Sequence, residues 1–230
     1  MSRAPWPYYA RPRVGDGSQA FTAADVAAVR ARQVELNLPQ MFEWVHETAP
    51  TLRGAIDADV TEVPLLILER SQWRPVEPPG GVTLRLLEAD DPALPAALGV
   101  EHVAFGAPGT APGPQAITER DVYEVDAARL DYVRTRIRRG LSVTAVATGE
   151  FGPVAVGTLR PVGTVAEIVA VATLPAVRRQ GLGGAVTALL VEHALASGVE
   201  TLFLSAADDD VARIYERLGF RRAGTACFVQ

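Results

Sequence analysis

Seven short segments of the chain have the pattern of β-strands, because their apolar residues alternate with polar ones or run together between turn residues. They are residues 63–68, 82–87, 141–148, 153–162, 165–174, 201–206 and 223–230. Glycine and proline lie between most of them, as in the segment 148–152 that separates the third from the fourth. The pattern predicts a sheet in which the strands at the start of the C-terminal part of the chain are antiparallel.

Helices are predicted between these strands. In the second half of the chain they cover residues 90–105, 126–139, 181–198 and 211–220. The helix at 126–139 ends at Gly140, a favoured helix C-cap. Nearer the N-terminus, Thr22 with Asp25 marks a helix start, a second helix is predicted at 39–47, and a third follows Pro50. Residues 106–118 are predicted to be a loop.

This order of elements favours an α/β protein with a mixed sheet and helices on both faces. Five proline and glycine residues lie within 75–81 and indicate a domain edge. We therefore expect an N-terminal region at 1–75, a linker at 76–81 and a larger domain at 82–230.

Composition narrows the function classes. The 230 residues carry a formal net charge of −5, which argues against sequence-independent nucleic-acid binding. No apolar run reaches the ~18 residues that a membrane span needs, and no secretory signal is expected at the N-terminus. A single cysteine, Cys227, fits a reducing compartment. We expect a cytoplasmic protein without a metal site, since His46, His102 and His193 are widely spaced.

The segment Val171 to Val186, VATLPAVRRQGLGGAV, is the strongest chemical signal in the sequence. Apolar residues recur at steps of three and four from Leu182, so a helix begins at the glycines. The first amide N–H groups of a helix lack partners and lie at the positive end of its dipole. With two arginines and three glycines beside them, they predict an anion site, for which phosphate is a common occupant.

Three kinds of phosphate-binding loop differ in the residues that surround their glycines. The P-loop pattern needs Lys and Ser or Thr after its last glycine, whereas Ala185 and Val186 follow Gly184. The dinucleotide fingerprint requires a small residue where Val186 stands. The pattern R/Q-x-x-G-x-G/A, after a strand ending in V-x-x-P, is matched at every position from Arg178 to Gly183.

This loop resembles the pyrophosphate-binding loop of the GCN5-related N-acetyltransferases (GNAT). The resemblance extends over 166–198 and 199–224, and includes Tyr215 to Phe220, Y-x-x-x-G-F. It is most specific over about 140–230 and extends from residue 82. It implies the GNAT acyl-CoA N-acyltransferase fold, with an N-terminal extension.

The resemblance implies a function as well as a fold. GNAT enzymes transfer an acetyl group from acetyl-CoA to an amine by direct attack. It therefore implies an acyltransferase of the EC 2.3.1 class, with acetyl-CoA as co-substrate and a primary amine of a small molecule or peptide as acceptor.

Site residues are carried over from the family position by position. Glu167 matches the general base and Tyr215 the general acid. The cofactor would be bound by two groups of residues, a strand at Val171, Ala172 and Thr173 and a loop at Arg178, Arg179, Gln180, Gly181, Leu182, Gly183 and Gly184. The sheet is expected to splay beside a bulge at this strand, and one strand N–H would stabilise the oxyanion.

One position departs from the family pattern. Asp208 stands where an asparagine often helps to bind pantetheine; an aspartate can cap the following helix but cannot donate an amide hydrogen bond. This leaves a second hypothesis, a non-catalytic acyl-CoA-binding regulatory module. Residues 1–75 have three alternative roles: a degenerate partial GNAT repeat, a substrate-covering extension, or a homodimer contact.

Other candidates are better explained by packing or solvation. Cys227 is predicted to be a core residue, as are three aromatic residues that could otherwise line an acceptor pocket (Phe42, Trp44 and Trp73). The four arginines at 134, 136, 138 and 139 are predicted to form a solvated helix face.

Overall fold

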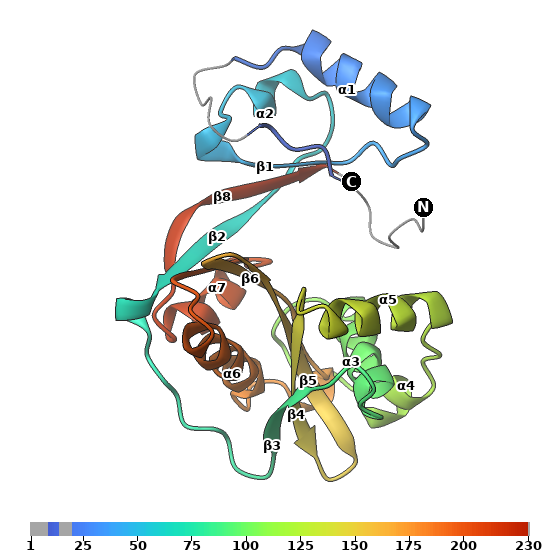
Figure 1. Ribbon diagram of the computed structural model, residues 1–230, viewed down its shortest axis with the longest axis vertical. Helices are drawn as coiled ribbons and strands as arrows, with labels where there is room; N and C mark the ends of the chain where they lie inside the picture. Colours follow the sequence, from blue (N-terminus) through green and yellow to red (C-terminus); the bar gives the residue numbers. More distant parts are fainter. Residues whose placement is uncertain (1–8, 14–19, 230) are drawn as a thin grey trace. The chain divides into compact units, whose positions relative to one another are not determined.

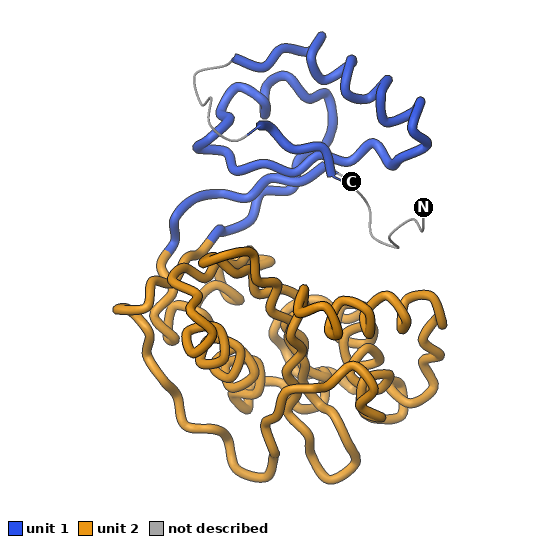
Figure 2. Tube along the Cα trace, in the orientation of Figure 1, with its two compact units in different colours: residues 1–65, 222–230 blue, residues 66–221 orange. Residues whose placement is uncertain are grey.

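A computed structural model describes residues 9–13 and 20–229 of the chain. It contains two compact units, one of residues 1–65 and 222–230 and the other of residues 66–221 (Figure 2). Each unit has its own hydrophobic core. The segment 76–81, predicted to be a linker, lies inside the second unit, where it precedes β3 (Thr83–Leu87).

The second unit contains most of the regular structure. After β2 (Thr61–Glu69), which begins in the first unit, its elements are η2 (Arg70–Gln72), β3, α3 (Leu94–Gly106), α4 (Ile117–Asp121), α5 (Ala127–Arg138), β4 (Val143–Gly149), β5 (Gly152–Val162), β6 (Val165–Thr173), η3 (Pro175–Val177), α6 (Leu182–Ala196), β7 (Thr201–Ser205) and α7 (Asp209–Glu216). The predicted strands and helices are confirmed here. The short helix α4 was not predicted, since its residues fall at the end of the expected loop 106–118 and just beyond it.

The sheet of the second unit is mixed, as predicted. In the described part of the chain, eight strands are hydrogen-bonded in the order β1-β8-β2-β7-β6-β5-β4-β3. The pairs from β3 to β6 are antiparallel, whereas β6 and β7 are parallel. Helices α6 and α7 cover one face in this unit, and α3, α4 and α5 lie on the other (Figure 1).

Local signals explain where the helices of this unit begin and end. The Asp126 carboxylate accepts a hydrogen bond from the Arg129 amide at 3.0 Å and caps α5 at its N-terminus. Gly140 follows that helix with a φ of 65°, a conformation that glycine adopts without a steric penalty. Pro95 stands in the first turn of α3, where it removes no intrahelical hydrogen bond.

The first unit is built from both ends of the described chain. It holds α1 (Ala23–Glu35), β1 (Phe42–Val45), η1 (His46–Thr48), α2 (Leu52–Ala55) and all but the first residue of β8 (Arg221–Val229). Helix α1 starts at a capping box, in which the Thr22 and Asp25 side chains accept from each other's backbone amides. The helix start predicted at Thr22 is therefore confirmed.

The helix predicted at 39–47 is wrong. Residues Phe42–Val45 form β1, which pairs antiparallel with β8. Phe42 and Trp44 alternate with more exposed neighbours and are each 4% exposed, so period-two burial against a strand replaces the helical period. Phe42 and Trp44 are confirmed as core residues, whereas Trp73 is half-buried, packs against the core of the second unit and lines a cavity there.

None of the helices in the described part of the chain is both long enough and apolar enough to cross a membrane.

Candidate functional site

Strands β6 and β7 separate partway along the sheet of the second unit. Their parallel pairing runs from Val165 opposite Thr201 to Glu167 opposite Phe203. On its other side, β6 changes register against β5 between Val156 and Thr158. The predicted splay and bulge of this strand are therefore confirmed.

The bulge has a distinct backbone conformation. Ala170 has a φ of 54°, in the left-handed region that residues with a Cβ rarely adopt. Such a backbone conformation persists only where the surrounding structure enforces it, and residues of this kind concentrate at functional sites. The bulge directly precedes Val171, Ala172 and Thr173, the residues expected to lie along pantetheine.

The glycine-rich loop lies at the end of the same strand. Gly181, with a φ of 81°, is the N-cap of α6, so the helix begins where the sequence predicts. Arg179 also has a positive φ, 67°, and Arg179, Gln180 and Gly181 are exposed. A Cβ added at Gly181 or Gly184 would meet no described atom within 4 Å. The space beside these backbone amides is therefore open to a ligand.

The strand and the loop are brought together by direct contact. A Cβ at Gly183 would lie 3.6 Å from Thr173 Oγ1 and 3.8 Å from Val171 Cγ1. Ala172 and Leu182 are only 6% and 3% exposed, so their side chains are not available to a ligand. The structure thus places the predicted pantetheine strand next to the predicted pyrophosphate loop.

Arg178 has a different environment from its neighbour Arg179. Its guanidinium donates to the carbonyl oxygens of Thr173 (3.3 Å), Ala111 (3.2 Å), Ala104 (3.1 Å) and Ala107 (2.7 Å). Its backbone N–H donates to the Pro175 carbonyl. The side chain that the sequence assigns to the cofactor therefore binds the end of α3 and the segment after it.

Glu167 lies opposite Arg160 of β5, on the same face of the sheet. Its carboxylate is 3.9 Å from the Arg160 guanidinium and 31% exposed. A Cβ at Gly157 would meet Val186 and Leu190 of α6, so the alternate residues Thr158 and Arg160 lie on the face away from α6. The predicted base is therefore on the face that α3 covers.

Sequence reasoning missed a second acid on this face, Glu101 of α3. Its carboxylate forms an ion pair with Arg129 of α5 at 2.8 Å and also interacts with Arg160. Burial raises the pKa of Glu101, and the two arginines only partly oppose this effect. No sequence motif marks this residue, because its partners come from α5 and β5.

Tyr215 lies on α7 and is 6% exposed. Its ring packs edge to face against Phe220, with the centroids 6.0 Å apart. Burial raises the pKa of the phenol above its usual value, so the hydroxyl stays protonated at neutral pH.

Asp208 is the N-cap of α7. Its carboxylate accepts a hydrogen bond from the Val211 amide at 2.8 Å, and capping of this helix by an aspartate is therefore confirmed.

The cysteine that the sequence analysis assigned to the core has a structural role. Cys227 is fully buried in the core of the first unit, and burial raises the pKa of its thiol to about 11. In the described residues, no group of three His, Cys, Asp or Glu side chains could hold a metal ion.

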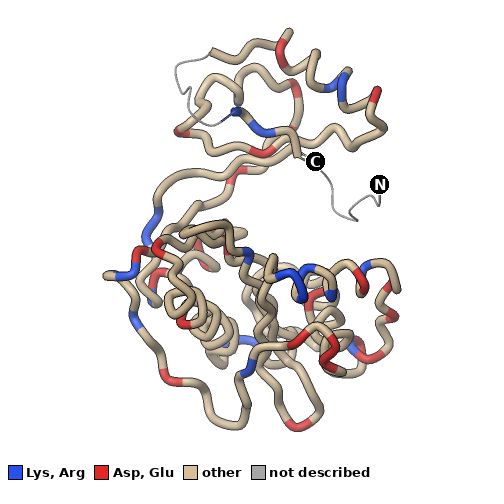
Figure 3. The backbone as a smooth tube through the Cα atoms, viewed as in Figure 1, with Lys and Arg blue, Asp and Glu red and all other residues tan. Residues whose placement is uncertain are grey.

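The basic residues of α5 are visible in Figure 3, but they are not simply solvated. Arg138 pairs with Asp90 at 2.6 Å, and Arg136 donates to the Leu141 carbonyl at 2.7 Å. The Nε atom of Arg134 is buried. The prediction of a solvated face is confirmed for Arg138 and Arg139, which are exposed, whereas Arg134 and Arg136 are half-buried.

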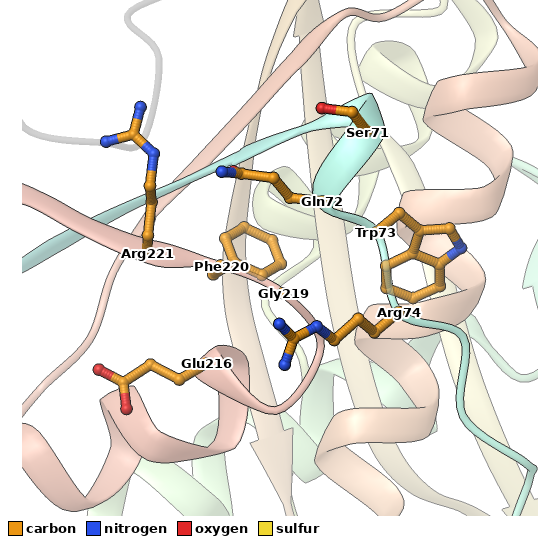
Figure 4. Close-up of a pocket in the computed structure, with 8 residues that line it drawn as sticks. All are labelled: Ser71, Gln72, Trp73, Arg74, Glu216, Gly219, Phe220 and Arg221. Carbon is orange, nitrogen blue, oxygen red and sulfur yellow. The ribbon is translucent and has the colours of Figure 1, made fainter.

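A cavity of about 410 Å³ lies elsewhere in the second unit (Figure 4). It is lined by residues 71–74, by Glu216 and by residues 219–221. None of the predicted site residues lines it, so it is separate from the strand and loop described above.

Part of the chain matches a known protein family. Residues 113–220 match the model of the acetyltransferase (GNAT) family. This stretch of the chain is a GNAT domain, and the activity of that family in general is acyl-CoA-dependent acetyl transfer. No curated protein sequence matches the chain.

Solved structures resemble a larger part of the chain. A GCN5-related N-acetyltransferase from Kribbella flavida is 25% identical with a TM-score of 0.66, over 91% of this chain and 76% of that one. A tandem GNAT protein from the clavulanic acid biosynthesis pathway is 16% identical with a TM-score of 0.60, over 89% and 67%. A GCN5-related N-acetyltransferase from Sphaerobacter thermophilus is 16% identical with a TM-score of 0.57, over 86% and 62%. The last two show likeness of fold alone.

Proposed function

We propose that the protein is an acetyl-CoA-dependent N-acetyltransferase that acts on a primary amine of a small molecule or peptide. One observation carries the proposal: β6 separates from β7 beyond Glu167, directly before an open, glycine-rich helix N-terminus. The separated strand offers its edge to an extended ligand. The helix N-terminus offers amides to the anionic end of the same ligand.

Each part of acetyl-CoA has a matching part of this site. The pyrophosphate would accept hydrogen bonds from the backbone amides of Arg179 to Gly184, with the charge of the exposed Arg179 beside them. The pantetheine arm would lie along Val171 to Thr173. An N–H of this strand would face the thioester oxygen and stabilise the oxyanion as charge develops there.

Glu167 is proposed as the general base. An alkylamine is mostly protonated at neutral pH and must lose a proton before it can attack the thioester. A carboxylate at the start of the separated strand can take that proton directly or through a water molecule. The Arg160 guanidinium lies 3.9 Å from this carboxylate and can hold its position.

Tyr215 is proposed as the proton donor to the leaving thiolate. Its raised pKa keeps the phenol neutral and able to donate. Because a thiol has an ordinary pKa near ~8.5, complete transfer from the phenol is uphill. A hydrogen bond to the thiolate therefore supplies most of the effect, at about 1.5–3 kcal/mol.

A non-catalytic acyl-CoA-binding regulatory module is the second candidate, and Asp208 favours it. Its carboxylate caps α7 and offers pantetheine no donor. We further propose that the first unit is a degenerate partial GNAT repeat, a cover for the acceptor or a dimer contact. Its strands and the likeness to a tandem GNAT fold support the first of these.

Thermal unfolding with added CoA tests what both candidates share. A ligand at 100 times its Kd stabilises the folded state by about 2.7 kcal/mol. The melting temperature is therefore expected to rise with CoA concentration, and an unchanged melting temperature contradicts both candidates.

Release of free CoA thiol from acetyl-CoA with a panel of amines separates the two candidates. The enzyme is expected to release thiol with at least one amine, and Tyr215→Phe to lower kcat about 10- to 150-fold for loss of one hydrogen bond to a charged group. Binding of CoA without turnover across the panel would favour the regulatory module.

A further inference from the structure

Arg178 joins two parts of the second unit that are distant in sequence. Its guanidinium donates to two carbonyls in the last turn and C-cap of α3, to a third in the following segment and to a fourth at the end of β6. Four carbonyls around one planar group define its position more tightly than a single ion pair does. The residue that opens the cofactor loop is thus fixed to the end of α3.

The segment 107–116 also contacts the turn before the loop through its own backbone. The Gly113 amide donates to the Pro175 carbonyl at 3.1 Å, and the Ala176 amide donates to the Gln115 carbonyl at 3.0 Å. A Cβ at Gly113 would lie 3.1 Å from Pro175 Cβ. This close approach makes the segment sensitive to any shift of the turn that leads into the loop.

The positive charge of Arg178 has no acidic partner among the described residues. Its side chain appears in none of the described ion pairs, and its pKa is lowered by partial burial alone. The carbonyls at the C-terminus of α3 compensate the charge in part, because they form the negative end of the helix dipole. An anion at the adjacent loop would compensate it further.

We propose that Arg178 is a positioning residue that couples the cofactor loop to the segment 107–116. An anion bound by the loop amides stabilises the partly buried guanidinium, and the guanidinium holds the carbonyls of α3 and Ala111. By thermodynamic linkage, order in the segment and affinity for the anion then favour each other. This inference rests on the proposed function for its ligand, whereas the connection made by Arg178 exists without it.

Hydrogen–deuterium exchange of the full chain, with and without CoA, tests the coupling. In the wild type, CoA is expected to slow exchange of the Gly113 and Ala176 amides about 5- to 150-fold, the usual range for coupled sites. In Arg178→Gln, saturating CoA is expected to leave these amides unprotected. Arg179→Gln is the matched control, because it removes the same charge one residue later and the Arg179 side chain is not among the donors to these carbonyls. In this variant the affinity for CoA should fall, but saturating CoA should still protect the Gly113 and Ala176 amides.

Arg178→Lys tests whether the positive charge alone is sufficient, or whether the four hydrogen bonds are needed. It also provides a second variant in case Arg178→Gln does not fold. A lysine ammonium restores the charge but cannot reach all four carbonyls, so it should recover only part of the protection. Full recovery with lysine, or full protection in Arg178→Gln, would overturn the proposal. Unchanged exchange in the wild type despite bound CoA would also overturn it.

A control without ligand keeps this inference distinct from the proposed function. Without CoA, Arg178→Gln should already exchange faster than the wild type at the Gly113 amide. If CoA does not bind the wild type, the proposed function and the coupling both fail. If, in addition, the ligand-free exchange does not change in the variant, the positioning role of Arg178 also fails.

Discussion

Replacing Gly157 by alanine would place a methyl group between β5 and α6. The new Cβ would lie 2.9 Å from Val186 Cγ1, 3.1 Å from Leu190 Cδ1 and 3.4 Å from Val171 Cγ2. Val186 and Leu190 are fully buried, so neither can move aside into solvent. Overpacking of this kind costs about 1–3 kcal/mol, offset by about 0.5–1 kcal/mol for removing a glycine from a strand.

The free energy of unfolding is therefore expected to fall by about 0–2.5 kcal/mol, with a midpoint of about 1.3 kcal/mol. For a chain of 230 residues the midpoint corresponds to a melting temperature lower by about 3–5 °C. Urea unfolding followed by circular dichroism measures the loss. Gly106→Ala is the matched control, because a Cβ there meets no described atom within 4 Å.

A double-mutant cycle with Val186→Ala tests whether contact with α6 is the cause. Val186→Ala alone should cost about 2 kcal/mol, because it removes two buried methyl groups. In the Gly157→Ala background it should cost at least about 1 kcal/mol less, since the alanine methyl fills part of the space. Costs that add within about 0.5 kcal/mol would refute the reasoning.

Three further predictions concern single residues. Asp208→Asn should retain the cap to Val211. Under the proposed function it should also lower the Kd for CoA about tenfold, which is the effect of one hydrogen bond. An unchanged Kd in a titration would place Asp208 outside the cofactor site. The hydrogen-bonded Arg85 guanidinium lowers the pKa of Asp91 in the folded state, so this carboxylate stabilises the fold above its unfolded pKa and loses that contribution as the pH falls through its folded pKa. Asp91→Asn should cost about 1 kcal/mol at pH 7 and flatten the acid limb of unfolding; equal slopes below about pH 4 would contradict this. Cys227, with a thiol pKa of about 11, should resist alkylation at pH 8 until urea unfolds the chain, as mass spectrometry would show.

Local patterns in the sequence were sufficient for most of the second unit. The helix from Leu182 and the strand before it have strong periodicity and clear end signals, and both were predicted. β1 was missed because the apolar residues of 39–47 fit a helix as well as a strand. What decides between the two is pairing with β8, whose residues lie far along the chain. A local pattern contains no information about such a partner.

The candidate site divides in the same way. The motif correctly locates a loop at a helix N-terminus, since its glycines and their positive φ values are properties of neighbouring residues. It could not show that Arg178 faces α3, whose carbonyls come from residues more than 70 positions earlier. Glu101 was missed for the same reason, since its significance depends on Arg129 and Arg160.

The composition of the first core has a consequence for protein synthesis. Cys227 and Val229 pack there with residues from the first 60 positions, whereas the core of the second unit uses only residues 66–220. On the ribosome, the second unit can therefore assemble as soon as its last strand and helix emerge. Until the residues of β8 have emerged, Phe42 and Trp44 lack the strand that covers them.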